Sequence, residues 1–93
     1  MRCKTAGELY DVIDRIAPFS TQCEWDNSGL LVGSADSKVN RIGVVLDITV
    51  EAIEKARSLG IDTIVAHHPV IFRPISNIPV DSPTYLLVKY GMT

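Results

Sequence analysis

The two histidines of the sequence stand side by side, in the string His67-His68-Pro69. They directly follow residues 61–66, a run rich in β-branched residues that predicts a strand. Ligands of open α/β sheets gather at the carboxyl ends of the strands, which is where this pair would lie. Neutral imidazole binds divalent ions such as zinc, iron, nickel, cobalt and manganese. The pair is therefore a candidate metal-binding site.

The two histidines are neighbours in the sequence, which limits how they could bind metal. Neighbouring residues of an extended strand face opposite sides of a sheet, so His67 and His68 would not share one ion there. Past the strand end they can splay, and Pro69 keeps His68 out of the helical region. This geometry suits two ions, one on each imidazole, with a bridging carboxylate. Two imidazoles do not complete a site, because catalytic zinc takes about three protein ligands. The alternative is that the pair only bonds to loop carbonyls.

Asp47 is a further candidate, because it ends another predicted strand, residues 41–47. From there it could reach the same crevice as the histidines, in a pocket or behind the metal ligands. The alternative is a helix N-cap, because both Asp47 and Thr49 offer caps for the helix that follows, and for Asp47 this role is favoured over metal binding.

Trp25, Asp26 and Asn27 form a polar and aromatic cluster before Gly29. They could line a pocket or support the metal shell. The alternative is that Trp25 packs in the core or the loop while Asp26 and Asn27 form an Asx turn. The sequence contains no glycine-rich phosphate loop and no nucleophile elbow.

Hydrophobic periodicity predicts one α/β domain over residues 1–93, with a partial, mostly parallel sheet and flanking helices. A strand, a helix and a strand follow one another at the length of a parallel crossover. Only two or three strands are accounted for, which leaves an open sheet edge and uncovered apolar faces. We therefore expect a fragment of a larger fold, or completion by self-association. The expected elements are helix 5–17, short strand 30–32, strand 41–47, helix 49–60, strand 61–66 and helix 82–91.

The composition is that of a globular domain, with 93 residues of which 46% are hydrophobic and 22% charged. It excludes intrinsic disorder, and a net charge of −2 without a Lys/Arg cluster argues against a strongly electrostatic nucleic-acid binder. No apolar run approaches the about 20 residues of a membrane span, and no signal region follows Met1. Cys3 and Cys23 are too far apart for a CxxC site, so we interpret them as reduced thiols of a cytoplasmic protein.

Three motifs occur in a specific order and spacing. They are Glu24-x-Asp26-Asn27-x-Gly29-Leu30 with Trp25 and the later Gly33, Leu46-Asp47-x-Thr49, and His67-His68-Pro69-x-Ile71-Phe72. Together they resemble the N-terminal part of the NIF-three-like family, also called GTP cyclohydrolase type-two homologues or dinuclear metal-centre proteins. The resemblance covers nearly the whole chain and implies the N-terminal portion of that α/β fold.

The resemblance also implies a dinuclear centre of divalent metal ions, with His67 and His68 as ligands. The family's other ligands come later, as an Asp after the next strand and a His and a Glu near the C-terminus. None of these has a counterpart here, so the site is half present. Zinc, iron, manganese and nickel all remain candidates. The family's proteins are cytoplasmic and form ring-like homo-oligomers, typically hexamers.

Three functional hypotheses follow. The first is a metal-dependent hydrolase, GTP cyclohydrolase type-two-like, in its full-length form, acting on an unidentified small molecule. The second is a non-catalytic metal-binding module with a regulatory or protein-interaction role, and the third is an inactive fragment. No residue that would read a guanine base is identifiable, and neither a membrane nor a nucleic acid is an expected partner.

Overall fold

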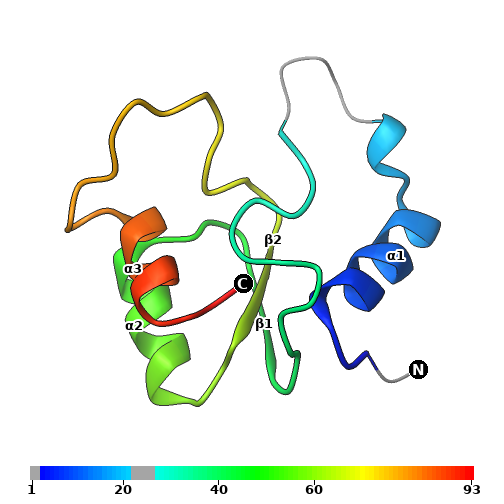
Figure 1. Cartoon of the computed structure of the whole chain (residues 1–93), viewed down its shortest axis with the longest axis horizontal. Helices are drawn as coiled ribbons and strands as arrows, with labels where there is room; N and C mark the ends of the chain where they lie inside the picture. The colour runs from blue at the N-terminus through cyan, green and yellow to red at the C-terminus, as the bar shows by residue number, and fades with distance from the viewer. Residues whose placement is uncertain (1–2, 22–26) are drawn as a thin grey trace.

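The computed structural model describes residues 3–21 and 27–93 of the chain. In this part of the chain, helices surround a small parallel sheet, which confirms the predicted α/β class (Figure 1). The elements in chain order are α1 (Ala6–Ile16), the 3-10 helix η1 (Phe19–Thr21), β1 (Ile42–Val45), α2 (Val50–Ser58), β2 (Thr63–Ala66) and α3 (Pro83–Lys89).

Each α-helix begins after a hydroxyl residue that caps it. Thr5, Thr49 and Ser82 precede α1, α2 and α3, and each side-chain oxygen accepts a hydrogen bond from the backbone N–H three residues later. Such a cap satisfies one of the N–H groups that the first helical turn leaves unpaired. The predicted helix starts are thereby confirmed.

Residues 30–32 do not form the expected strand, so that prediction was wrong. Gly29 and Gly33 lie on either side of this run with φ angles of 140° and 104°, which turn the chain out of an extended path. Val32 packs instead against the hydrophobic core between α2 and α3. The apolar run is therefore partly buried by a bent loop and not by pairing in the sheet.

The sheet consists of β1 and β2, which pair in parallel with Ile42 opposite Thr63 and Val45 opposite Ala66. The last residue of the chain lies along the other edge of β2. Thr93 N donates to the Asp62 carbonyl at 3.0 Å, and Ile64 N donates to the Thr93 carbonyl at 2.8 Å. This is the bonding pattern of a parallel neighbour, so β2 has partners on both edges.

The two faces of the sheet are covered unequally (Figure 1). On one face, α2 and α3 enclose the hydrophobic core, into which Ile64 of β2 packs. On the other face, Ile42, Val44 and Leu46 of the β1 segment are 43%, 79% and 62% exposed. The expected uncovered apolar face is therefore present. The buried core residues are Ile53, Ala56, Leu86, Leu87 and Met92.

Helix α1 is attached through its first turn to the loop of residues 34–39. Ala6 N donates to the Ser37 carbonyl and Gly7 N to the Ala35 carbonyl, both at 2.8 Å. A side chain at Gly7 would place its Cβ only 3.1 Å from the Ala35 carbonyl oxygen. The close approach of the loop to α1 therefore depends on a glycine at this position.

Among the residues that the structure describes, no helix combines the length and the apolar composition that crossing a membrane requires. Cys3 is a free thiol, and Cys23 lies outside the described residues.

Candidate metal centre

His67 and His68 lie directly after β2, and the backbone there departs from the regular alternation of a strand. His67 N donates to the Val45 carbonyl at 3.1 Å, and His68 N donates to the Leu46 carbonyl at 3.0 Å. In a regular strand, successive N–H groups point to opposite edges, whereas here both point toward the β1 segment. The chain therefore turns at this position. The two rings lie edge to face with centroids 4.8 Å apart, and both side chains are exposed.

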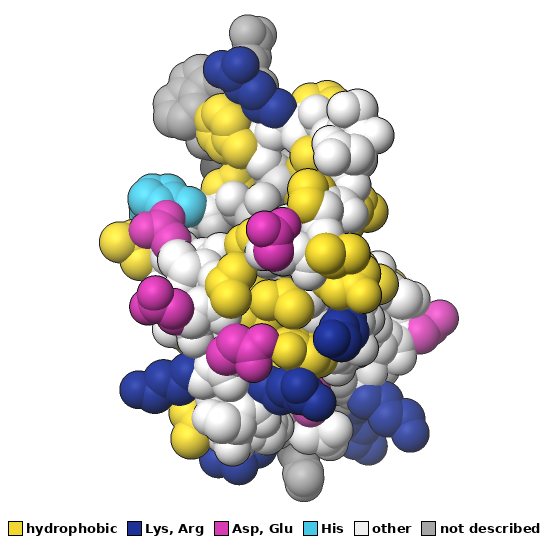
Figure 2. All heavy atoms as spheres, turned by 90° about the vertical axis from the view of Figure 1, so that its left-hand side faces the viewer, with side chains coloured by type: hydrophobic (Ala, Val, Ile, Leu, Met, Phe, Trp, Pro, Cys, Tyr) yellow, Lys and Arg dark blue, Asp and Glu magenta, His cyan; other side chains and the backbone are white. Residues whose placement is uncertain are grey.

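Asp47 contacts the second of these histidines. Its Oδ1 lies 2.6 Å from Nδ1 of His68, and the two side chains are 57% and 56% exposed. Figure 2 shows histidine at the molecular surface with an acidic side chain directly against it. The interpretation of Asp47 as the cap of α2 was wrong, because Thr49 occupies that position. The Asp47 carboxylate is directed toward the end of β2 instead.

Asn27 connects its own loop to the segment that follows the histidines. Its Nδ2 donates to the backbone carbonyl of Ile71 at 2.6 Å. This contact keeps the start of the loop at residues 27–32 next to the chain that leaves β2. Trp25 and Asp26, the other members of the predicted cluster, lie outside the described residues.

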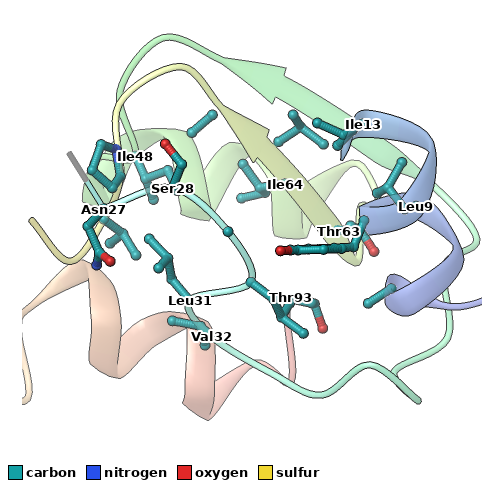
Figure 3. A pocket seen from close by; sticks show the side chains of 18 of the residues that line it. Leu9, Ile13, Asn27, Ser28, Leu31, Val32, Ile48, Thr63, Ile64 and Thr93 are labelled. Atoms are coloured by element: carbon teal, nitrogen blue, oxygen red, sulfur yellow. The ribbon is translucent and has the colours of Figure 1, made fainter. Parts of the chain in front are cut away.

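An apolar pocket of about 200 Å³ opens between α1, residues 27–32 and β2, and His67 lines it. Figure 3 shows Leu9 and Ile13 of α1 toward one end of the pocket and Asn27 and Ser28 toward the other. No Lys, Arg, Asp or Glu is among the described residues that line it. The described lining can therefore hold an apolar group beside His67, and it brings no Lys or Arg to a phosphate.

The donor atoms at the end of the sheet fit part of a metal site. Two exposed imidazoles lie side by side, and neutral imidazole nitrogen is a good ligand for divalent transition metals. Within residues 3–21 and 27–93, no group of three or more His, Cys, Asp or Glu side chains is arranged to hold an ion. His67 and His68 would thus hold metal together with ligands from elsewhere.

One contact of this site was not expected from the sequence. The partner of Asn27 is a backbone carbonyl, and a carbonyl gives no residue-type signal that a sequence pattern could detect. The contact between Asp47 and His68 had a signal, namely that each residue follows the end of a predicted strand. The sequence also allowed Asp47 to be a helix cap, and this interpretation was preferred.

A strand–helix–strand unit with two imidazoles beyond its second strand defines an α/β protein with a candidate metal site at the sheet edge. Comparison with protein-family models extends this description. The model of Duf34/NIF3 (NGG1p interacting factor 3) matches residues 4–91. The chain belongs to the Duf34/NIF3 family, as the resemblance of its three motifs predicted.

Curated relatives and solved structures agree with this membership. A GTP cyclohydrolase 1 type 2 homolog of Staphylococcus aureus (strain Mu50) is 39% identical over 83 residues, which are 89% of this chain and 23% of that protein. The crystal structure of a hypothetical protein from S. aureus matches with a TM-score of 0.92 at 32% identity, over 99% of this chain and 27% of that one.

A Bacillus cereus protein related to NIF3 matches with a TM-score of 0.88 at 27% identity, over 99% of this chain and 26% of that one. The chain therefore spans about a quarter of the length of these proteins. Its fold corresponds to one portion of the larger family fold, as predicted.

Proposed function

We propose that this chain supplies the histidine half of a divalent-metal site in a metal-dependent hydrolase, with His67 and His68 as metal ligands. The observation that carries the proposal is the pair of exposed imidazoles, 4.8 Å apart between ring centroids, at the carboxyl end of a parallel strand. Divalent ions bound there would polarise a substrate and promote formation of hydroxide from water near neutral pH.

The surrounding residues of this chain have separate tasks in this proposal. His67 borders the apolar pocket, so a substrate bound there would lie next to the metal ligands. His68 is backed by the Asp47 carboxylate. The substrate is an unidentified small molecule. The name GTP cyclohydrolase 1 type 2 homolog belongs to relatives, and the described pocket offers no charged side chain to a triphosphate.

The site needs ligands that the described residues do not provide, so the proposed protein is larger than these elements. We propose that an Asp, a His and a Glu from later in a longer chain complete a pair of divalent ions. The uncovered face at Ile42 and Val44 supports assembly with further protein, because exposed apolar patches mark interaction surfaces. A ring-like homo-oligomer, typically a hexamer, in the cytoplasm is the assembly that we propose.

A second candidate is a non-catalytic metal-binding module with a regulatory or interaction role. The observation that favours it is the absence, within the described residues, of a third side chain placed to hold an ion together with the histidines. In this case the metal would stabilise an assembly and would not take part in turnover.

Metal content and turnover, measured on the same samples, separate these functions. The full chain is incubated with Zn²⁺, Mn²⁺ or Fe²⁺, desalted and examined by elemental analysis, and p-nitrophenyl acetate, whose apolar ring suits the pocket, is offered as a probe substrate. We expect the wild-type chain to retain metal and the His67→Ala and His68→Ala variants to lose it. Asn77→Ala, which changes an exposed residue of the loop before α3, is the control.

Metal retention with metal-dependent ester hydrolysis would support the hydrolase. Metal retention without ester hydrolysis, combined with a metal-dependent change in oligomer size, would favour the non-catalytic module. A wild-type chain that retains none of the three metals would contradict both and leave the inactive fragment.

A further inference from the structure

The contact between Asp47 and His68 is set by the register of the sheet. Every paired position of β1 and β2 is 21 residues apart, as Ile42 and Thr63 are. Asp47 and His68 continue this offset past the strand ends, and they too are 21 residues apart. Both side chains therefore emerge at the same edge of the sheet, and the carboxylate meets the ring nitrogen at 2.6 Å.

The chemistry of the two groups decides which ring nitrogen carries the hydrogen. An ionised carboxylate is only an acceptor, so Nδ1 of His68 must be the donor. A neutral imidazole carries one N–H, which leaves Nε2 with a free lone pair. An isolated imidazole side chain in water favours the opposite arrangement, with the hydrogen on Nε2. For a neutral His68 ring, the contact with the Asp47 carboxylate thus requires the less common tautomer, with the hydrogen on Nδ1.

We propose that Asp47 is the positioning residue of the metal site: it holds His68 in the Nδ1–H tautomer and leaves Nε2 as the atom that binds metal. This inference rests on the proposed function for its metal, and on the 2.6 Å contact for its geometry. Hydrogen bonds from a metal-binding imidazole to a carboxylate orient the ring and make it more basic. His67 has a ring contact with His68 but no such carboxylate among the described contacts.

An ordinary surface ion pair would show the same contact, so the two roles need different readouts. With both side chains more than half exposed, the pair contributes little to the stability of the fold, about 0–1 kcal/mol. A positioning role predicts an effect on the tautomer and on metal affinity that is larger than the effect on folding.

The tautomer is measured directly on the metal-free full chain. Two-bond ¹H–¹⁵N correlation spectra of the histidine rings at neutral pH distinguish a protonated from an unprotonated ring nitrogen. We expect His68 to carry its hydrogen on Nδ1 in the wild-type chain and to shift toward Nε2 in Asp47→Ala. In Asp47→Asn, the amide oxygen can still accept from Nδ1, so the Nδ1–H tautomer persists in part. A neutral His68 ring in the wild-type chain with its hydrogen on Nε2 and with Nδ1 unprotonated would overturn the inference.

Metal affinity is measured by calorimetric titration with Zn²⁺ alone. We expect Asp47→Ala to weaken binding by about 10- to 100-fold, the usual effect of removing such a partner. Asp36→Ala removes an exposed carboxylate from another loop, has the same net charge and should bind as the wild-type chain does. Equal losses in the two variants, or no loss in Asp47→Ala, would overturn the inference.

The two measurements also separate this inference from the proposed function. A wild-type chain that binds no Zn²⁺ would contradict the proposed function. The tautomer of His68 in the metal-free chain would then still decide whether Asp47 controls this ring.

Discussion

Asn27 and Ile71 lie 44 residues apart in the sequence and are joined by one hydrogen bond, in which Asn27 Nδ2 donates to the Ile71 carbonyl at 2.6 Å. The bond links the loop that borders the pocket to the segment that follows the histidines. Neither partner belongs to a helix or strand, so the position of both segments depends on side-chain contacts such as this one.

Replacement of Asn27 by Ala should lower the free energy of unfolding by about 1–3 kcal/mol, because it leaves a part-buried carbonyl without its donor. Urea unfolding followed by circular dichroism measures this change. Asn77→Ala, which changes an exposed loop residue, should leave the midpoint within error. Equal midpoints for both variants would show that the bond to Ile71 does not stabilise the fold.

Gly33 and Gly91 provide a matched test of close packing at the end of the chain. Both have positive φ angles, 104° and 66°, so alanine is conformationally strained at either position. A Cβ at Gly33 would lie 2.6 Å from Thr93 Oγ1, whereas a Cβ at Gly91 would meet no atom within 4 Å.

We therefore expect Gly91→Ala to lower the free energy of unfolding by about 1–2 kcal/mol through backbone strain. Gly33→Ala should cost about 1–3 kcal/mol more, since the added methyl group displaces Thr93 from β2. Urea unfolding of both variants gives the comparison. If Gly33→Ala were the milder change, the contact between this loop and the end of the chain would be disproved.

Asp62 should make the stability depend on pH in the acid range. Burial raises the pKa of its carboxyl, but hydrogen bonds from Thr63 Oγ1 and from the N–H groups of Asn40 and Arg41 outweigh this and lower the pKa below 3.8. Because the Asp62 carboxyl has a lower pKa in the folded chain than in the unfolded chain, its ionised form stabilises the fold. This stabilisation is present at pH values above the unfolded pKa of 3.8 and is lost as the pH falls through the folded pKa.

Urea midpoints measured between about pH 5 and pH 2 should therefore fall as the pH decreases, and Asp62→Asn should flatten this part of the curve. Thr63→Val removes one donor while keeping the shape of a buried side chain, so it should move the loss to higher pH. If the urea midpoints of Asp62→Asn fell with decreasing pH as those of the wild-type chain do, other carboxyl groups would be responsible for the pH dependence.

Truncation of Ile53 and of Val44 should change the free energy of unfolding to very different extents, because the two side chains differ in burial. Ile53 of α2 is 0% exposed in the core, and Ile53→Ala should cost about 2–5 kcal/mol through a cavity. Val44 of β1 is 79% exposed, and in the monomer Val44→Ala should change the free energy of unfolding by less than about 0.5 kcal/mol. A large loss in Val44→Ala would show that this face is covered in solution, for which the oligomeric state is the next measurement.

Local signals in the sequence were sufficient for most of the secondary structure. Capping by Thr5, Thr49 and Ser82 is a contact between residues three apart, so it can be predicted without knowledge of the fold. The prediction of a strand at residues 30–32 was wrong because the shape of this segment does not depend on local signals alone. An apolar triplet indicates that a segment is at least partly buried, but the glycine φ angles decide its shape, and no strand among the described residues pairs with it.

In the candidate site, too, local features could be predicted from the sequence and contacts between distant segments could not. The placement of His67 and His68 at a strand end follows from the residues before them. The pairing of Asp47 with His68 depends on which residue of β1 lies opposite which residue of β2. That register depends on which residues of the two strands face the core together, so neither segment specifies it alone.

The contact of Thr93 with β2 has a consequence for local opening of the sheet. Within the described chain, β2 has neighbours on both edges while β1 has one. Fluctuations therefore release β1 before β2, because fewer hydrogen bonds hold it. Asp47 follows β1, so it lies at the end of the strand that we expect to open first. Because His67 N and His68 N donate to the carbonyls of Val45 and Leu46, such an opening would also release the backbone that carries the imidazoles.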